Sequence, residues 1–238
     1  MKQFLLLALF VVFFSCKEEA TQENAESVAQ DSNALTEERE YAVLDSKVLD
    51  TEALWKPFEF DTKMFTETKY SKLKPLIFEK NIPEIQEAVA QGKLTYEELV
   101  LFYLTRIKKY DRENELSLNS IIALNPKILD QARELDEKRP QDLDPYSIYG
   151  MPILLKDNIN ASDMPTTAGA VVFEDNNAGD AFITQKLKEN GALILGKANL
   201  SEWAYFFCGD CPSGYSAVGG QTLNPYGRKI HDTGGSSS

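Results

Sequence analysis

Histidine and cysteine are scarce in this chain, which has one histidine and three cysteines among 238 residues. A Ser-His-Asp triad would have to use His231, which lies in the stretch before the glycines 234 and 235, and we interpret it as incidental. Cys208 and Cys211 alone do not supply the ligands of a tetrahedral zinc site. The sequence therefore argues against a conventional triad and predicts no metal site.

Basic residues are also few, with 25 Lys and Arg against 37 Asp and Glu, a net charge of −12. Binding to phosphate backbones needs clustered Lys and Arg, so we expect no nucleic-acid partner. The composition, 43% hydrophobic and 26% charged, is that of a soluble globular protein. The length fits one ordinary domain or a larger one cut short.

The one long apolar run covers residues 4–14 and follows Lys2. It is too short to span a bilayer and is typical of a signal-peptide core. Ser15 and Cys16 follow, a small residue before a cysteine, as in a bacterial lipobox. We predict a lipoprotein signal peptide at 1–15, lipidation of Cys16, and an exported protein anchored by lipid to a bacterial membrane, on its periplasmic or cell-surface face. The alternative is an ordinary signal peptide with an incidental cysteine.

After this segment, residues 16–46 are rich in Glu, Gln, Asn, Ser and Ala and almost lack aromatic residues. Such a segment cannot bury enough apolar surface to offset its ordering entropy, so we predict a disordered tether. Residues 47–81 have aromatic residues without a clear period, and we expect an N-terminal extension with one short helix.

Beyond residue 82 the pattern alternates between helices and strands. Helices are predicted at 83–90, from a capping box at 95–98 through Tyr110, from Asn125 to Lys138, after an N-cap at Asp180, and at 200–206. The apolar runs 151–155 and 192–195 are predicted to be buried strands. This order predicts an α/β fold with a largely parallel central sheet flanked by helices.

Several short motifs occur in a fixed order over residues 94–238. They are Gly-Met-Pro-Ile-Leu-Leu-Lys-Asp-Asn at 150–158, Pro-Thr-Thr-Ala-Gly at 165–169, Gly-Lys-Ala-Asn-Leu-Ser-Glu-Trp-Ala at 196–204, Gly-Gly-Gln-Thr-Leu-Asn-Pro-Tyr at 219–226 and Gly-Gly-Ser-Ser at 234–237. In this order they resemble the amidase signature family, whose hydrolases use a Ser-Ser-Lys triad. The resemblance implies the family's fold, with a parallel or mixed sheet, in a domain that begins near residue 82 and is incomplete here.

The resemblance also implies which residues are catalytic. Lys156 matches the family's catalytic lysine, and a buried lysine readily loses its proton and serves as a base. Ser236 matches the bridging serine, whose hydroxyl can both donate and accept a hydrogen bond. The family's nucleophilic serine lies roughly two dozen residues further on, so we expect this chain to be an inactive fragment of an amidase.

Other residues have supporting predictions. Asp157 and Ser237 are expected to hold the loops around Lys156 and Ser236. Ser213, Gly214 and Ser216 correspond to a loop beside the substrate cleft in relatives, although ordinary turn chemistry explains them equally well. The resemblance implies no cofactor and a small amide or peptide-amide substrate.

Cys208 and Cys211 form a Cys-x-x-Cys motif. A redox role would place this motif at a helix N-terminus after a strand, whereas here it follows a predicted helix. In an exported chain a structural disulfide is the better interpretation. Three alternatives for the whole chain stay open: a surface redox module, a non-catalytic lipoprotein that binds amidated ligands, and a transamidation-type amidase subunit.

Overall fold

The computed structural model describes residues 44–112, 117–207 and 212–227. The chain divides into two units, Met1–Arg39 and Glu40–Ser238, and every described residue belongs to the second. Among these described residues, no helix is both long and apolar enough to cross a membrane.

The segment from residue 51 to 77 is more helical than predicted. In place of one short helix it has α2 (Thr51–Trp55), the 3-10 turn η1 (Lys56–Phe58), α3 (Glu59–Met64) and α4 (Glu67–Ile77). Asp50 and Thr66 begin α2 and α4, each accepting a hydrogen bond from a backbone N–H of the first turn. Of the aromatic residues that show no period, Trp55, Phe58, Phe65 and Tyr70 are buried, whereas Phe60 is 74% exposed. α2 and α3, with 5 and 6 residues, are too short to display a helical period. α4 buries Tyr70, Leu73 and Ile77 at helical spacing, a signal that the sequence-based prediction missed.

The next two helices agree with the prediction. α5 (Ile82–Ala90) ends one residue before a turn in which Gly92 has a φ of +66°. α6 (Tyr96–Ile107) begins at a capping box in which Thr95 and Glu98 exchange hydrogen bonds with each other's backbone N–H. It continues into a π-helical turn, η2 (Lys108–Arg112).

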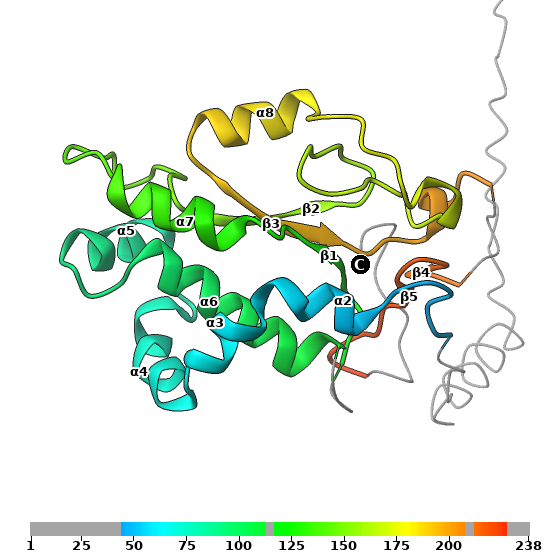
Figure 1. Ribbon diagram of the computed structural model, residues 1–238, viewed down its shortest axis with the longest axis horizontal. Coiled ribbons are helices and arrows are strands. Elements are labelled where there is room, and N and C mark those ends of the chain that lie inside the picture. Colours follow the sequence, from blue (N-terminus) through cyan, green and yellow to red (C-terminus); the bar gives the residue numbers. More distant parts are fainter. Residues whose placement is uncertain (1–43, 113–116, 208–211, 228–238) are drawn as a thin grey trace, which may run out of the picture. The chain divides into compact units, whose positions relative to one another are not determined.

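A three-stranded sheet in the order β1-β3-β2 follows these helices and lies between α6 and α8 in Figure 1. β2 (Pro152–Lys156) runs parallel to the central β3 (Leu193–Ala198), as predicted, and β1 (Ile121–Leu124), which the sequence pattern does not reveal, runs antiparallel to it. The sheet is therefore mixed.

The prediction that the run at 151–155 is a fully buried strand is wrong. β2 is at the edge of the described sheet, and the Leu154 side chain is 41% exposed while Leu155 is buried. An edge strand has a neighbour on one side alone, so an apolar run does not guarantee burial on both faces.

Two predicted helix starts are wrong. α7 (Ile128–Glu137) has Lys127 as its N-cap, and Asn125 instead accepts a hydrogen bond from the Lys127 N–H in the turn before the helix, at 3.0 Å. α8 (Phe182–Glu189) has Ala181 as its N-cap.

Asp180, predicted to cap α8, does so through neither of its carboxylate oxygens. Its Oδ1 accepts hydrogen bonds from the Ser162 N–H and from Lys188 Nζ. The Asp180 carboxylate therefore binds Ser162 and Lys188 and does not cap α8.

The predicted helix at 200–206 is reduced to a 3-10 turn, η4 (Glu202–Tyr205). Trp203, Ala204 and Tyr205 all have φ between 50° and 68°. Side chains with a Cβ rarely adopt this left-handed region, and a right-handed helix cannot continue through it.

Two apolar clusters lie on opposite faces of the sheet. The larger includes Leu193 and Leu195 of β3 and the inner faces of α4, α5, α6 and α7. The smaller groups Ile194 and Leu155 with Ala161 and Met164, and Leu187 of α8 packs against it. Figure 1 shows α8 on one side of the sheet and α6 and α7 on the other.

The start of the described chain pairs with a hairpin formed much later, β4 (Tyr215–Ser216) and β5 (Gly220–Gln221). The Gln221 N–H donates to the Leu44 carbonyl, and the Lys47 N–H donates to the Ala217 carbonyl, each at 2.7 Å. Residues 44–46, which the sequence placed in the tether, are therefore held by backbone contacts.

Candidate active site

Lys156 is the last residue of β2 and is half-buried. Its backbone is opposite Ala198 in the β2–β3 ladder, and its carbonyl accepts a hydrogen bond from the Ile159 N–H at 2.9 Å. The residue therefore stands where the strand ends and a tight turn begins, as its position after an apolar run predicts.

Asp157, the next residue, is buried, with 1% of its surface exposed. Its Oδ2 accepts hydrogen bonds from the Thr167 N–H at 3.1 Å, from the Thr167 hydroxyl and from the Gly169 N–H at 3.4 Å. Its backbone N–H donates to the Ala198 carbonyl, and its own carbonyl accepts from the Ala168 N–H. These contacts join the lysine strand to the Pro-Thr-Thr-Ala-Gly segment and suit the supporting role predicted for Asp157.

A second lysine, Lys197 of β3, is completely buried. Its Nζ donates to the Ile159 carbonyl at 2.6 Å and to Thr166 Oγ1 at 2.8 Å, and it forms an ion pair with Asp157 Oδ1 at 3.4 Å. Sequence reasoning did not assign Lys197 a role. The available signal was the apolar run at 192–195 before it, which parallels the run before Lys156.

Burial opposes the charge on both partners of this ion pair. It lowers the pKa of the Lys197 amine, although the Asp157 charge acts in the other direction. It also raises the pKa of the Asp157 carboxyl, against the hydrogen bonds from Thr167 and the charge of Lys197. The attraction across 3.4 Å is therefore smaller than the loss of hydration.

The ladder register separates the two lysines. Lys156 is paired with Ala198, whereas Lys197 is paired with Leu155. Paired side chains share a face of the sheet and successive ones alternate. Lys156 and Lys197 therefore point to opposite faces, so Lys197 does not occupy the position of Lys156.

The 213–216 loop forms a second polar cluster. Ser216 is fully buried, and its hydroxyl donates to Asn199 Oδ1 at 2.7 Å and accepts from the Gly219 N–H at 2.8 Å. Gly214 has a φ of +78° and donates its N–H to the Ser201 hydroxyl.

Gln221 Nε2 also donates a hydrogen bond to the Ser213 carbonyl at 2.6 Å. These contacts are those of a structured hairpin and favour the turn interpretation of Ser213, Gly214 and Ser216. The cleft role of the three residues stays a prediction.

Asn199 connects this hairpin to the sheet and has no role in the sequence-based prediction. It is fully buried, and its amide donates to the carbonyls of Asn119 and Gly220 and to the Thr222 hydroxyl. Asn199 directly follows β3, so it lies at the same end of the strands as Lys156.

The remaining predicted site residues lie outside the described residues. They are Cys16, Cys208, Cys211, Ser236 and Ser237. The pairing of Lys156 with Ser236 and the disulfide between the two cysteines therefore stay predictions.

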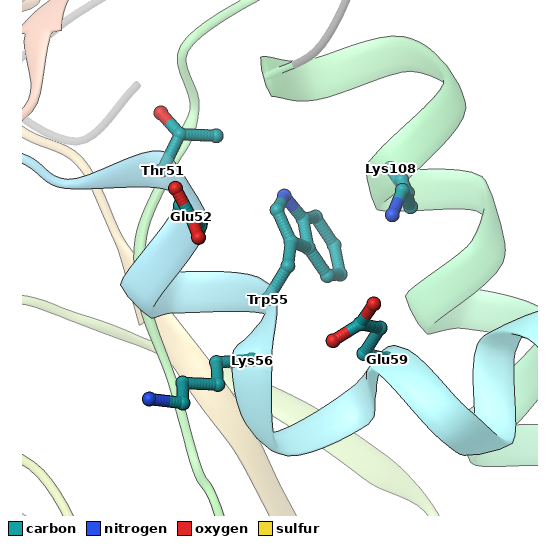
Figure 2. Close-up of a pocket in the computed structure, with 6 residues that line it drawn as sticks. All are labelled: Thr51, Glu52, Trp55, Lys56, Glu59 and Lys108. Atoms are coloured by element: carbon teal, nitrogen blue, oxygen red, sulfur yellow. The ribbon is translucent and has the colours of Figure 1, made fainter.

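A surface groove of about 430 Å³ lies elsewhere, beside the buried indole of Trp55 (Figure 2). The Lys108 ammonium lies 5.5 Å from the centre of that ring. The groove is lined by Thr51, Glu52, Trp55, Lys56, Glu59 and Lys108. It shares no residue with the cluster around Lys156, so the groove and the candidate active site are separate features.

Comparison with known proteins identifies similar chains. The Amidase family model matches residues 98–238. A probable amidase of Arabidopsis thaliana is 40% identical over 167 residues, covering 68% of this chain and 31% of its own length. A putative amidase of Schizosaccharomyces pombe is 34% identical over 188 residues, covering 75% of this chain and 31% of its own length. The chain thus spans about a third of the curated relatives that it matches.

Solved structures give the same result. An amidase family protein from Bacillus anthracis has a TM-score of 0.74 at 37% identity, covering 84% of this chain and 39% of its own. The native peptide amidase from Stenotrophomonas maltophilia has a TM-score of 0.59 at 42% identity, covering 63% of this chain and 30% of its own. The mixed sheet with its flanking helices is therefore the arrangement found in these relatives.

Proposed function

This chain belongs to the amidase family, and on that premise we propose that it takes part in the hydrolysis of an amide C–N bond by a Ser-Ser-Lys triad. The observation that carries the proposal is the position of Lys156 inside the matched region. It ends a strand, and Asp157 fixes the backbone immediately after it. A lysine that acts as a base needs its backbone held in place, because proton transfer requires a hydrogen bond of suitable distance and direction.

The proposed reaction passes protons along the triad. The unprotonated Lys156 amine accepts a proton from the Ser236 hydroxyl, and Ser236 accepts one from a nucleophilic serine. In the family that serine lies roughly two dozen residues beyond the bridging serine. The serine oxygen bonds to the amide carbonyl carbon, and the C–N bond breaks with a proton delivered to the departing amine. Water then hydrolyses the acyl-enzyme, and backbone N–H groups near the nucleophile stabilise the oxyanion.

Peptide amides or small linear amides are the proposed substrates. The 42% identity to a peptide amidase supports this class. A second candidate comes from a glutamyl-tRNA(Gln) amidotransferase component of Exiguobacterium sibiricum, which is 32% identical and covers 68% of this chain. The apolar leader at 4–14 favours the first candidate, since an exported protein would not meet aminoacyl-tRNA. Release of ammonia from peptide amides, without any tRNA, separates the two.

We propose that the protein is exported and anchored through acyl chains on Cys16. The apolar core at 4–14 supports export, and acyl chains would supply the membrane attachment that so short a core cannot give. Intact mass of the mature N-terminal peptide tests the proposal. An unmodified N-terminus at another residue contradicts it.

The triad is tested in protein that extends through the nucleophile. Lys156→Ala and Ser236→Ala are each expected to lower turnover by about a thousandfold or more without unfolding, because members of a proton relay fail together. His231→Ala is the matched control and should retain turnover, and the 238-residue chain alone should have none. Near-native turnover of Lys156→Ala, or robust turnover by the 238-residue chain, would contradict the proposal.

A further inference from the structure

The turn that follows Lys156 is fixed at both of its ends. At the first end, the Asp157 N–H donates to Ala198 in the β2–β3 ladder, and at the other the Ile159 N–H donates to the Lys156 carbonyl. Lys156 and Asp157 share a peptide bond, so the contacts that hold this turn also hold the backbone from which the Lys156 side chain extends.

Lys197 donates hydrogen bonds to residues at both ends of this turn. Its ammonium has three N–H donors, and they meet the Ile159 carbonyl, the Asp157 carboxylate and the Thr166 hydroxyl. The first two acceptors belong to the turn, and the third lies in the segment that also binds the other Asp157 oxygen through Thr167. The lysine therefore binds acceptors that lie outside the helices and the sheet ladder.

Stability alone does not explain this pair. Apolar residues of similar volume often replace a buried ion pair without loss, because burying two charges costs as much as their attraction returns. Burial lowers the pKa of Lys197 and raises that of Asp157, so hydration loss is the larger effect here too. Apolar residues could not reproduce the directional contacts of Lys197. Its three hydrogen bonds, at 2.6 to 3.4 Å, fix the turn in one geometry.

We propose that Lys197 is a positioning residue, which acts through Asp157 and Ile159 to fix the turn after Lys156 and thereby the direction of the Lys156 amine. The catalytic part of this statement rests on the proposed function. Lys197 points to the face of the sheet opposite to Lys156, so it acts through the turn and does not touch the reacting atoms.

The first test measures the turn without any assay of activity. Amide hydrogen exchange by NMR on the 238-residue chain reports the Ile159 and Ala168 N–H groups, which bond to the carbonyls of Lys156 and Asp157. Lys197→Met should speed both exchanges by about tenfold or more beyond any change in the amides of the β2–β3 ladder, whose exchange reports the general loss of stability. Unchanged protection of Ile159 and Ala168 would overturn the proposal.

Smaller substitutions test the same contact in case Lys197→Met does not fold. Thr166→Val keeps the shape of the side chain but removes one acceptor of Lys197, so it should loosen the same two amides, and Thr166→Ser should restore them. Arg112→Met is the matched control, because Arg112 is also a buried cation beside a carboxylate, that of Asp111 at 3.6 Å. It should leave the turn unchanged, and equal loosening by this control would overturn the proposal.

The second test uses the protein extended through the nucleophile. With the variant folded, Lys197→Met should lower kcat by about a hundredfold and leave KM within about twofold, as expected for a misdirected base. An inactive wild-type protein whose turn still loosens in Lys197→Met would remove the proposed function and support the fixing of the turn. An active wild-type protein with native kcat in folded Lys197→Met would overturn the positioning role and keep the proposed function.

Discussion

The two faces of β3 are built on different principles. On one face Leu193 and Leu195 pack into a broad apolar layer with α6 and α7. On the other face Ile194 belongs to a small apolar group, and Lys197 is buried in polar contacts. Apolar contacts have no preferred direction, whereas each buried polar group needs a partner at a defined distance and angle. The apolar face therefore stabilises the domain, and the polar face defines the geometry beside Lys156.

This difference has a measurable consequence. Within the apolar layer each substitution removes buried surface, so losses in separate positions add. Within the polar cluster the cost lies in leaving one partner alone, so removing both partners costs less than removing one. Single and double substitutions therefore distinguish the two faces.

Lys197→Met should have the largest effect. It leaves the buried Asp157 carboxylate without its cation and should lower the free energy of unfolding by about 4 kcal/mol. The double variant Asp157→Asn/Lys197→Met should recover much of that loss. Urea denaturation of the chain measures both. A double variant less stable than Lys197→Met would show that this face behaves like the apolar one.

Phe102→Ala tests the apolar face. Phe102 in α6 is fully buried and stacks on Tyr70, with ring centres 4.6 Å apart. Its truncation leaves a cavity and should cost about 3 kcal/mol. Phe60→Ala is the control, because Phe60 is 74% exposed, and it should change stability by less than about 0.5 kcal/mol. Similar losses from both variants would mean that α3 and α6 bury their aromatic residues differently from the structure.

Thr95→Ala tests the N-terminal cap of α6, the helix that contributes Phe102 to the apolar layer. Thr95 accepts a hydrogen bond from the Glu98 N–H at 3.0 Å and so caps α6. Its loss should cost about 1 kcal/mol, and Thr95→Ser should retain most of the cap. The midpoint of thermal unfolding compares the three proteins. Equal losses in the Ala and Ser variants would point to packing of the threonine methyl group instead of capping.

The smallest expected effect is a dependence on pH at the polar face. Burial lowers the pKa of Lys197 from its ordinary value of 10.5. Between the lowered folded pKa and 10.5 the unfolded chain binds more protons than the folded chain, so the contribution of Lys197 to stability rises with pH in that window. The difference in unfolding free energy between wild type and Lys197→Met should therefore widen as pH is raised toward 10.5. A difference that stays constant or narrows would contradict the direction of the shift.

Local signals in the sequence predicted a good part of the fold. The capping box at Thr95 and Glu98 gave the start of α6, and the apolar runs before Lys156 and Lys197 gave β2 and β3. These features depend on neighbours a few residues apart, so they are visible without the fold. The ordered motifs gave the family, which the match over residues 98–238 confirms.

Other features depend on partners distant in the chain. Asp180 has the residue type of a helix cap, but Lys188 and Ser162 compete for its carboxylate. β1 is a short strand that is defined by its antiparallel pairing with β3. Such outcomes follow from contacts that form after the elements are assembled, so local patterns do not contain them.

The sequence by itself determined the helices with capping boxes, the two apolar strands, the order of the family motifs and the position of Lys156 at the end of a strand. The tertiary structure alone decided that Lys197 is buried against Asp157, Thr166 and Ile159, and that the two lysines point to opposite faces of the sheet. The physical reason is that a similar short pattern, an apolar run with a lysine after it, predicts a strand that includes the lysine. It does not fix which face the lysine takes, because that depends on the register with the neighbouring strand and on the acceptors waiting there.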